Sequence, residues 1–404
     1  MGSTAVRSIL REPYTIGSYE SECMADIDRR SLLKAAGASA FATSLAGCTG
    51  SLTGGGGGGS NTLESVGMTA YVRGGAWITA YIEAAEFYAQ DQGIDLEVRP
   101  NQQSAQKQVQ DIREFANGDK DAILAGVWST GAAEGAIDQA MERGTPVFAT
   151  NADTSSENIP LYVGFSNTEG GQKSAEEMLK ALEAQYPEKD TWNVLNVRGI
   201  QGNQSANQRS QGFMNVMRNE GKVNVRQTLN GEYARDIAQS TTQEWLNANG
   251  MVDGIYSGNL SMGLGVVQAL RNLNALVPKG QEGHVVLTQM DGSPEVNPLV
   301  GEGMIDAAVD QPNYFYNPIA MHYMRQYVEA GNSMDAIPEV GSTVGSDQFS
   351  IPANQHKDVE MWSEPIWEPG EIREQNAHPW FRTNSIVINQ DNHDQPFLWG
   401  NVWG

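Results

Sequence analysis

Short apolar runs alternate with stretches of helical periodicity along most of the chain. The apolar runs predict strands and the periodic stretches predict helices, because a buried parallel strand reads as a continuous apolar run. A first series places strands at 66–72, 94–98, 121–127 and 146–149, with helices at 83–87, 103–115 and 134–141. A second series places helices at 169–184, 205–218, 236–246 and 262–273, with strands at 193–197, 224–229, 254–257 and 285–288. Such alternation predicts βαβ units, so the expected fold class is α/β with two Rossmann-like parallel-sheet lobes.

Two further segments connect these series. Residues 162–167 lie between the two series, and residues 306–311 follow the second one. We expect both segments to pass from one lobe to the other and so to form a hinge with several crossovers. The N-terminal lobe is then expected over 62–165 plus about 312–335, and the C-terminal lobe over 166–311.

The alternation weakens towards the C-terminus, where residues 336–404 are rich in Trp, Asn, Asp and Pro and show no helical period. The large rings of this stretch are Trp362, Trp367, Trp380, Trp399 and Trp403. Because each indole ring carries a large apolar surface, so many of them are not expected in solvent. We therefore expect a packed, Trp-rich C-terminal extension, whose function the residues do not indicate.

The N-terminus has the features of an export signal. Arg29-Arg30 is followed by a weakly apolar run of small residues at 35–46, which ends in Leu45-Ala46-Gly47-Cys48. Twin arginines before a mild apolar run indicate a Tat-type signal, and the run is too short to span a bilayer. The final four residues match a lipobox, so we expect cleavage before Cys48 and its lipid modification; an incidental cysteine is the alternative. The signal then covers 1–47, with Met24 as the expected true start.

A run of six glycines, Gly54 to Gly59, follows the expected anchor. Polyglycine has high backbone entropy and no pocket-forming side chains, so 48–61 is expected to be a flexible tether. A phosphate-binding loop is the sharper alternative, but no strand precedes the run and no Lys-Ser/Thr ends it. Since Cys23 and Cys48 are the two cysteines, residues 61–404 can hold no disulfide, Cys nucleophile or thiolate metal site.

Charge narrows the range of partners. The chain has 404 residues with 49 acidic and 26 basic side chains, a formal net charge of −23. Such a polyanion repels phosphate backbones, so we expect no nucleic-acid partner, and a neutral ligand rather than an anionic one. The acidity and the low Lys content, nine against seventeen Arg, indicate a high-salt habitat, with an ordinary acidic secreted protein as the alternative.

Polar and aromatic side chains gather directly after the predicted strands. In open parallel sheets, ligands bind in the crevice beyond the carboxyl ends of the strands. The residues at such positions are Arg73, Trp77, Trp128, Asn151, Asp153, Asn203, Arg209, Tyr233, Asn259, Asp291 and Gln311. Amides, carboxylates and a guanidinium pair with ring hydroxyls, and flat rings stack on C–H faces, which indicates a sugar site. Each residue alone also suits a cap, a turn or packing.

Several short segments follow one another in a distinctive order over about residues 66–330. They are Asp121–Leu124 with Gly144–Val147, Val163–Gly171, Gly199–Gly202 with Arg209–Phe213, Gly258-Asn259 with Met262–Gly265, Gln289–Gly292 and Ala308–Pro312. In this order they resemble the ribose- and galactose-type solute-binding proteins of ABC importers, which have the type I periplasmic binding fold. A single such segment would be a weak signal, whereas the common order makes the resemblance strong.

The resemblance implies roles for individual residues. Family positions that hydrogen-bond sugar hydroxyls are occupied here by Arg209, Asn259, Asp291 and Gln311. Aromatic wall positions are occupied by Tyr233 and Trp77. Asn151 falls on a position that is commonly Asp, and Ala152 follows where some members have Arg, so one expected donor is missing. Asp153 is expected to take over part of that contact.

Together these features predict an extracytoplasmic solute-binding lipoprotein. It would capture a neutral monosaccharide, either a pentose, a hexose or a related polyol, and deliver it to an ABC permease with its ATPase. We expect a monomer that contacts the membrane only through its lipid anchor, binds no cofactor or metal and has no catalytic residues.

Two alternatives are an exported glycoside-acting enzyme and a sugar sensor for a chemoreceptor. Against an enzyme, the sequence has no Gly-x-Ser-x-Gly and no His-Glu-x-x-His, and its five histidines lack ligand spacing. A sugar-responsive repressor would need a basic helix-turn-helix where this chain has the export signal.

Overall fold

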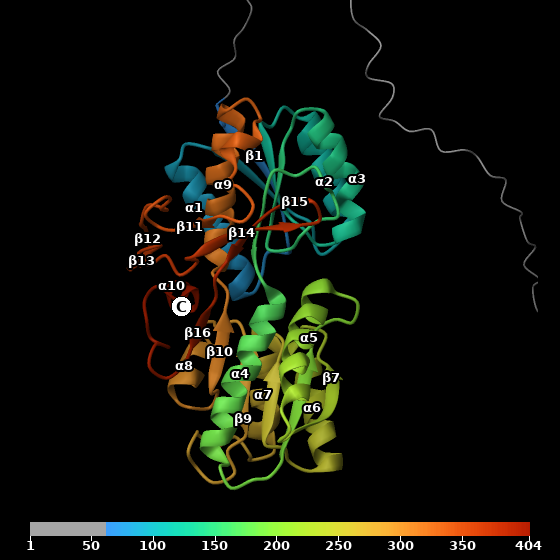
Figure 1. Ribbon diagram of the computed structural model, residues 1–404, viewed down its shortest axis with the longest axis vertical. Coiled ribbons are helices and arrows are strands. Elements are labelled where there is room, and N and C mark those ends of the chain that lie inside the picture. Colours follow the sequence, from blue (N-terminus) through green and yellow to red (C-terminus); the bar gives the residue numbers. More distant parts are fainter. Residues whose placement is uncertain (1–61) are drawn as a thin grey trace, which may run out of the picture. The chain divides into compact units, whose positions relative to one another are not determined.

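The computed structural model describes residues 62–404. The predicted export signal, Cys48 and the glycine tether lie outside the described residues. The described part belongs to one compact unit, in which two sheets flanked by helices form two lobes (Figure 1). The predicted α/β class with two parallel-sheet lobes is confirmed.

The N-terminal lobe is built on an eight-stranded sheet with the strand order β11-β14-β15-β5-β4-β3-β1-β2. Three of these strands come from the C-terminal part of the chain, namely β11 (Thr343–Val344), β14 (Gly370–Gln375) and β15 (His378–Thr383). Its first strands along the chain are β1 Ser65–Ala70, β2 Asp95–Pro100, β3 Ala122–Gly126, β4 Val147–Thr150 and β5 Tyr162–Phe165. The helices between them are α1 Ala76–Asp91, α2 Ala105–Asn117 and α3 Thr130–Glu142. These five strands pair in parallel. Both faces of β3 and β4 are buried, which explains their continuous apolar runs.

The C-terminal lobe is built on a six-stranded sheet with the strand order β16-β10-β9-β8-β6-β7. Its strands are β6 Trp192–Arg198, β7 Val223–Asn230, β8 Gly254–Ser257, β9 Val286–Met290 and β10 Ala307–Asp310. Its helices are α4 Asn167–Gln185, α5 Gln204–Asn219, α6 Arg235–Asn249, α7 Leu260–Asn272 and α8 Val296–Gly301. β6 to β10 pair in parallel, so their carboxyl ends lie at one edge of the sheet.

Three connections in the described part carry the chain between the two sheets. β5 leads into α4, β10 leads into α9 (Asn313–Glu329), and β15 leads into β16. The first two are the predicted crossovers, whereas the third comes from the C-terminal extension. α9 returns to the N-terminal lobe, where Asn317 Nδ2 donates to Tyr81 O at 2.7 Å and Asn317 Oδ1 accepts from Thr150 Oγ1 at 2.9 Å.

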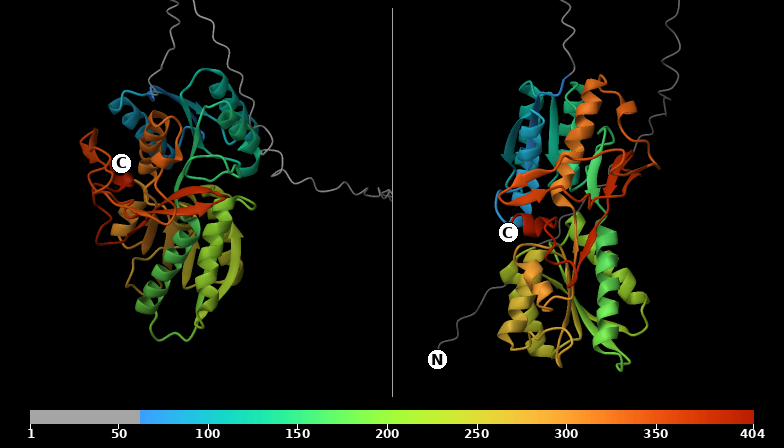
Figure 2. Two further views of the ribbon diagram at one scale, coloured as in Figure 1. Left: turned by 45° about the horizontal axis from the view of Figure 1, so that its top comes forward. Right: turned by 90° about the vertical axis from the view of Figure 1, so that its left-hand side faces the viewer.

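The C-terminal extension is hydrogen-bonded to both sheets. Its elements are η2 Met334–Ala336, β11 Thr343–Val344, β12 Asn354–His356, β13 Val359–Met361, β14 Gly370–Gln375, β15 His378–Thr383, β16 Ile386–Ile388 and α10 Trp399–Val402. β15 pairs in parallel with β5 and β16 pairs antiparallel with β10, so the extension runs beside both lobes (Figure 2). Trp362, Trp367 and Trp399 are buried, while Trp380 and Trp403 are half-buried. The extension is therefore a structural part of both lobes.

Candidate functional site

A cavity of about 650 Å³ lies between the two lobes, at the carboxyl ends of strands from both sheets. Nine of the predicted residues line it, namely Trp77, Trp128, Asn151, Asn203, Arg209, Tyr233, Asn259, Asp291 and Gln311. Sites for small molecules commonly measure about 300–1,000 Å³. The expectation that ligand-binding residues follow the ends of parallel strands thus identifies residues that are widely separated in the sequence but line one cavity.

Arg209 lies on α5 and reaches the cavity because α4 and α5 approach closely. A Cβ on Gly171 would lie 2.1 Å from Arg209 O, and a Cβ on Gly212 would lie 2.0 Å from Thr168 O. Only glycine permits this contact, since real side-chain carbons do not come so close. The contact brings the guanidinium to the first residue of α4, where Arg209 Nε donates to Asn167 Oδ1 at 2.8 Å.

A buried ion pair forms the polar centre of the cavity wall. Arg209 Nη1 lies 3.3 Å from Asp291 Oδ2 and donates to Gly258 O at 2.9 Å. Although burial opposes the charged form, Asp291 raises the pKa of Arg209 above its usual value. Arg209 and Asp291 thus form an ion pair whose formal charges cancel.

Gln311 is oriented by hydrogen bonds at both ends of its amide. Gln311 Nε2 donates to Asp291 Oδ1 at 2.6 Å, and Gln311 Oε1 accepts from Tyr316 OH at 3.0 Å. Gln289 Nε2 also donates to Asp291 O at 2.8 Å. These contacts connect strand ends of β9 and β10 with the start of α9, so a rotation of one side chain disturbs its neighbours.

Two asparagines present amide donors because their oxygens cap helices. Asn203 Oδ1 accepts from Ala206 N, and Asn259 Oδ1 accepts from Met262 N, each at 3.0 Å. Asparagine is a favoured N-cap residue, so α5 and α7 begin where these side chains meet the cavity. With the oxygen engaged, the Nδ2 group is left to donate. Tyr233 OH also donates to Asn203 Oδ1, at 3.2 Å.

Aromatic rings of the N-terminal lobe form the opposite wall. Tyr71 contacts Trp77 and Trp128 edge-on, with ring centroids 6.4 and 6.3 Å apart, and Trp77 stacks on Tyr81 at 5.3 Å. Tyr71 OH accepts from Asn151 Nδ2 at 2.8 Å and so fixes the position of that amide. Trp77 Nε1 is buried and has no hydrogen-bond partner among the described residues. It is a donor for which a ligand acceptor would be favourable.

The backbone is left-handed at four non-glycine residues that line the cavity. The φ angles are 60° at Gln103, 66° at Asn151, 58° at Tyr233 and 69° at Asp291. Non-glycine residues in this region cost about 1–3 kcal/mol and cluster at functional sites. Asn151 and Asp291 directly follow β4 and β9, so the turn of the backbone directs each side chain after its strand ends.

Arg73 and Asp153 do not line this cavity, although Asp153 lines a smaller cavity beside it. Arg73 is half-exposed and pairs with Glu86 on α1, with 2.6 Å between Nη2 and Oε1. Asp153 is 2% exposed, and its oxygens accept from His378 Nε2 at 2.8 Å and Gln375 Nε2 at 2.6 Å. The extension thus occupies the carboxylate that was expected to contact the ligand.

Several lining residues were not predicted from the sequence. They are Tyr71, Gln103, Thr130, Gln204, Ser205 and Ser261. Tyr71 was placed inside the first strand, but β1 ends at Ala70, so Tyr71 also follows a strand end. Most of the others lie in the first turn of the helix that follows a strand. A search that included the first helical turn after each predicted strand would have found them.

The sequence matches the profile of a family described as "Periplasmic binding protein domain" over residues 66–333. It is 24% identical over 276 residues to the galactofuranose-binding protein of Escherichia coli, covering 66% of this chain and 83% of that protein. It is 22% identical over 229 residues to the ribose import binding protein of Haemophilus influenzae, covering 57% of this chain and 73% of that protein.

Solved structures show the same architecture. The crystal structure of a galactofuranose binding protein aligns with a TM-score of 0.64 at 18% identity, covering 82% of this chain and 97% of that chain. A periplasmic solute binding protein from Actinobacillus succinogenes with bound D-allose also aligns with a TM-score of 0.64 at 18% identity, covering 82% and 99% of the two chains. At this level of identity the likeness concerns the fold.

Proposed function

The chain belongs to the periplasmic binding protein domain family, and from this premise we propose that it captures a neutral monosaccharide between its lobes and delivers it to an ABC permease. Membership confirms the resemblance drawn from the sequence and, with the structural likeness, the type I periplasmic binding fold. Relatives named for galactofuranose, fructose and ribose support a sugar as the ligand class. Solved relatives with bound D-allose and arabinofuranose point the same way.

The observation that carries the proposal is that both lobes contribute hydrogen-bonding side chains to one cavity. Asn151 and Thr130 come from the N-terminal lobe, and Arg209 and Asn259 come from the C-terminal lobe. Such a mixture of donors, acceptors and flat rings suits ring hydroxyls and the C–H face of a sugar. Because Arg209 is neutralised by Asp291, the wall does not require a charged ligand.

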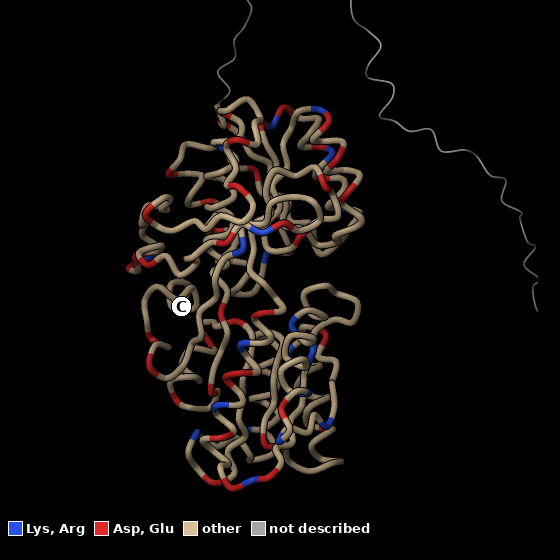
Figure 3. The backbone as a smooth tube through the Cα atoms, in the orientation of Figure 1, with Lys and Arg blue, Asp and Glu red and all other residues tan. Residues whose placement is uncertain are grey.

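The charge of the whole protein also favours a neutral ligand. Acidic positions are spread over both lobes rather than gathered in one patch (Figure 3). With a formal net charge of −23 for the chain, an anionic sugar would approach against the field. A neutral sugar has no such barrier.

Capture is coupled to closure of the lobes. A ligand that contacts Trp77 and Asp291 at once binds the closed arrangement better than an open one, and this difference in affinity drives closure. Thr130 Oγ1 donates to Gln204 Oε1 at 3.2 Å across the cleft, so the lobes of this structure are in contact. We propose that the closed form is the one recognised by the permease.

The proposal also covers the cellular location of the protein and its partners. We propose export by the Tat route and attachment of a lipid to Cys48, so that the glycine tether holds a monomer at the outer face of the membrane. Within residues 62–404, no helix has the length and apolar character needed to cross a bilayer. The permease and its ATPase are the proposed partners in transport.

Catalysis of glycoside cleavage is disfavoured by the site. Glycosidases use a pair of carboxyl groups on either side of the scissile bond. Asp291 is the sole acid that lines the larger cavity, and it is paired with Arg209. Asp153, which lines the smaller cavity beside it, is hydrogen-bonded to His378 and Gln375. Product analysis after long incubation with oligosaccharides would reveal an enzyme.

Calorimetric titration of the exported form with neutral sugars tests the proposal. The panel is D-ribose, D-allose, L-arabinose, D-galactose, D-fructose and myo-inositol, in low and in multimolar salt. For the sugar that binds, Asn259→Ser should weaken affinity about tenfold, because Ser keeps the helix cap but lacks the Nδ2 donor.

The matched control is Asn272→Ser, an exposed change at the other end of α7, which should leave affinity unchanged. If none of these sugars binds to the folded protein, capture of a neutral sugar is wrong.

A further inference from the structure

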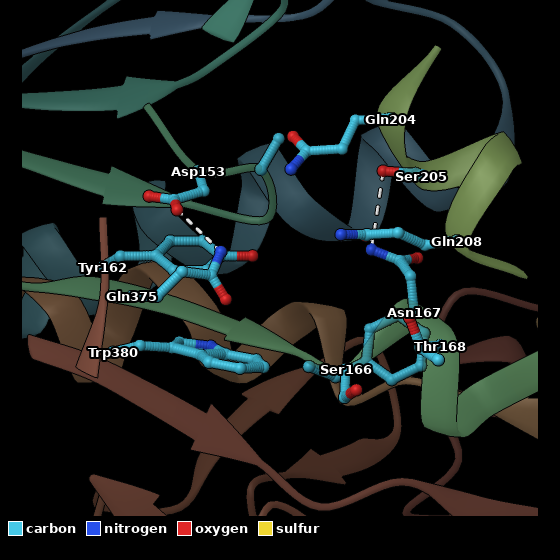
Figure 4. Close-up of a pocket in the computed structure, with 12 residues that line it drawn as sticks. Asp153, Tyr162, Ser166, Asn167, Thr168, Gln204, Ser205, Gln208, Gln375 and Trp380 are labelled. Carbon is cyan, nitrogen blue, oxygen red and sulfur yellow. Dashed lines mark hydrogen bonds between the residues drawn. The ribbon is translucent and has the colours of Figure 1, made fainter. Parts of the chain in front are cut away.

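A second, smaller cavity of about 130 Å³ lies beside the candidate site (Figure 4). It is enclosed by the loop after β4, the first crossover, the first turns of α5 and the β14–β15 hairpin of the extension. It shares Ala152, Gln204 and Ser205 with the larger cavity. The two cavities are thus adjacent and have part of their wall in common.

The lining of the second cavity is polar, and its groups have unused hydrogen-bonding capacity. Among the described residues, the Gln208 amide has no hydrogen-bond partner. Gln204 uses only its oxygen and Gln375 only its nitrogen in contacts within the described chain. Figure 4 shows these three amides around a space that is bounded below by the indole of Trp380. Trp380 is held in place by its Nε1 donating to Gly164 O at 2.9 Å and by stacking on Tyr162.

Amides beside an aromatic ring are the same combination that lines the larger cavity, and they suit hydroxyl groups on a small ring. At the shared wall, Ala152 contributes only a methyl group, which makes it the smallest of the side chains that line both cavities.

We propose that the second cavity is a subsite for a second sugar ring, so that the cleft accepts a disaccharide or a glycoside as well as a monosaccharide. This inference rests on the proposed function and widens its ligand class. Tyr162 and Trp380 belong to the N-terminal lobe sheet, whereas Gln204 and Gln208 belong to α5 of the C-terminal lobe. A second ring therefore contacts both lobes and strengthens closure, and the extension, through Gln375 and Trp380, determines which ring fits.

Titration of matched sugars tests the subsite. Calorimetry with the wild-type chain compares D-galactose with melibiose and lactose, D-glucose with trehalose and maltose, and L-arabinose with arabinobiose. We expect at least one disaccharide to bind about tenfold more tightly than its monosaccharide, which corresponds to one or two added hydrogen bonds. Gln208→Ala should abolish that gain and leave monosaccharide affinity unchanged, because Gln208 lines only the second cavity.

The matched control is Gln211→Ala, an exposed position on the same helix, which should keep the gain. If monosaccharides bind and every disaccharide binds equally or more weakly, or if the gain persists in Gln208→Ala, the subsite is wrong while the proposed function stands. If no saccharide binds at all, the proposed function itself fails and the subsite with it.

Discussion

Replacement of Arg209 by Lys tests the buried ion pair that organises the C-terminal half of the site. Lysine keeps the positive charge but has one ammonium group in place of a planar fork. In the structure that fork serves Asn167 Oδ1 at 2.8 Å, Gly258 O at 2.9 Å and Asp291 Oδ2 at 3.3 Å. Nη1 serves both Gly258 O and Asp291 Oδ2, whereas Nε serves Asn167 Oδ1. A single ammonium group cannot occupy both nitrogen positions, so at least one acceptor loses its donor.

The size of the effect follows from burial. Arg209 is 7% exposed and Asp291 is 3% exposed, so solvent does not replace the lost contacts. A buried acceptor left without its donor costs about 1–3 kcal/mol, so the free energy of unfolding should fall by about that amount. The matched control is Arg235→Lys, since Arg235 pairs with Glu295 at 2.9 Å with both side chains about half-exposed or more. That exposed pair should change the free energy of unfolding by less than about 1 kcal/mol.

Urea unfolding followed by tryptophan fluorescence measures both variants. The difference in midpoint multiplied by the common slope gives the change in the free energy of unfolding. Arg209→Lys should also weaken sugar binding by at least about tenfold, because the fork no longer positions Asp291. If Arg209→Lys unfolds at the same urea concentration as Arg235→Lys, the guanidinium is not the organising contact described here.

Three further predictions follow from other contacts. Burial raises the pKa of Asp310 from 3.8 to about 7, although the hydrogen bond from Trp399 acts in the opposite direction. Between these two pH values the folded state keeps a proton that the unfolded state has lost. The free energy of unfolding that this group contributes should therefore decrease as pH rises from about 4 to about 7. In pH-dependent urea unfolding, Asp310→Asn should lack this decrease relative to wild type, and parallel pH profiles would contradict the assignment. Tyr71→Phe should weaken sugar binding about three- to tenfold, because Asn151 Nδ2 loses its acceptor. The control is Tyr88→Phe, a buried change on α1 outside the cavity, which should leave the affinity unchanged. Equal affinities of the two variants in calorimetry would show that the contact between Tyr71 and Asn151 does not matter. Raising NaCl from 0.1 to 2 M should raise the midpoint of thermal unfolding, since salt screens the repulsion within a chain of net charge −23. The same change should barely affect the affinity for a neutral sugar. A midpoint that falls with salt in a thermal scan would contradict the expected screening.

The sheets could be predicted from the sequence because their signal is local. β3 and β4 are buried on both faces, and the apolar runs that result are visible without knowledge of their neighbours. α9 could not be recognised, because nearly all of its faces are buried and Pro318 interrupts the pattern, so no amphipathic period remains. The short strands of the extension become strands by pairing with β5 and β10, which are distant in sequence.

The residues of the candidate site likewise fall into those that a local sequence pattern predicts and those whose contacts depend on distant segments. Asn151 and Asp291 were found because the position after a buried strand is a local property of the chain. Asp153 sits at an equivalent position, yet His378 and Gln375, more than 200 residues further along, occupy its carboxylate. No pattern near Asp153 contains that information. The same long-range contacts build the second cavity, so it is visible only in the fold.

A crystal structure of the protein with its bound sugar tests the central claim most directly. The account predicts one sugar ring in the larger cavity, with Arg209 and Asn259 of the C-terminal lobe and Asn151 of the N-terminal lobe each within hydrogen-bond distance, and with Trp77 against its C–H face. A sugar that contacts one lobe alone, or that binds outside this cavity, would contradict capture between the lobes.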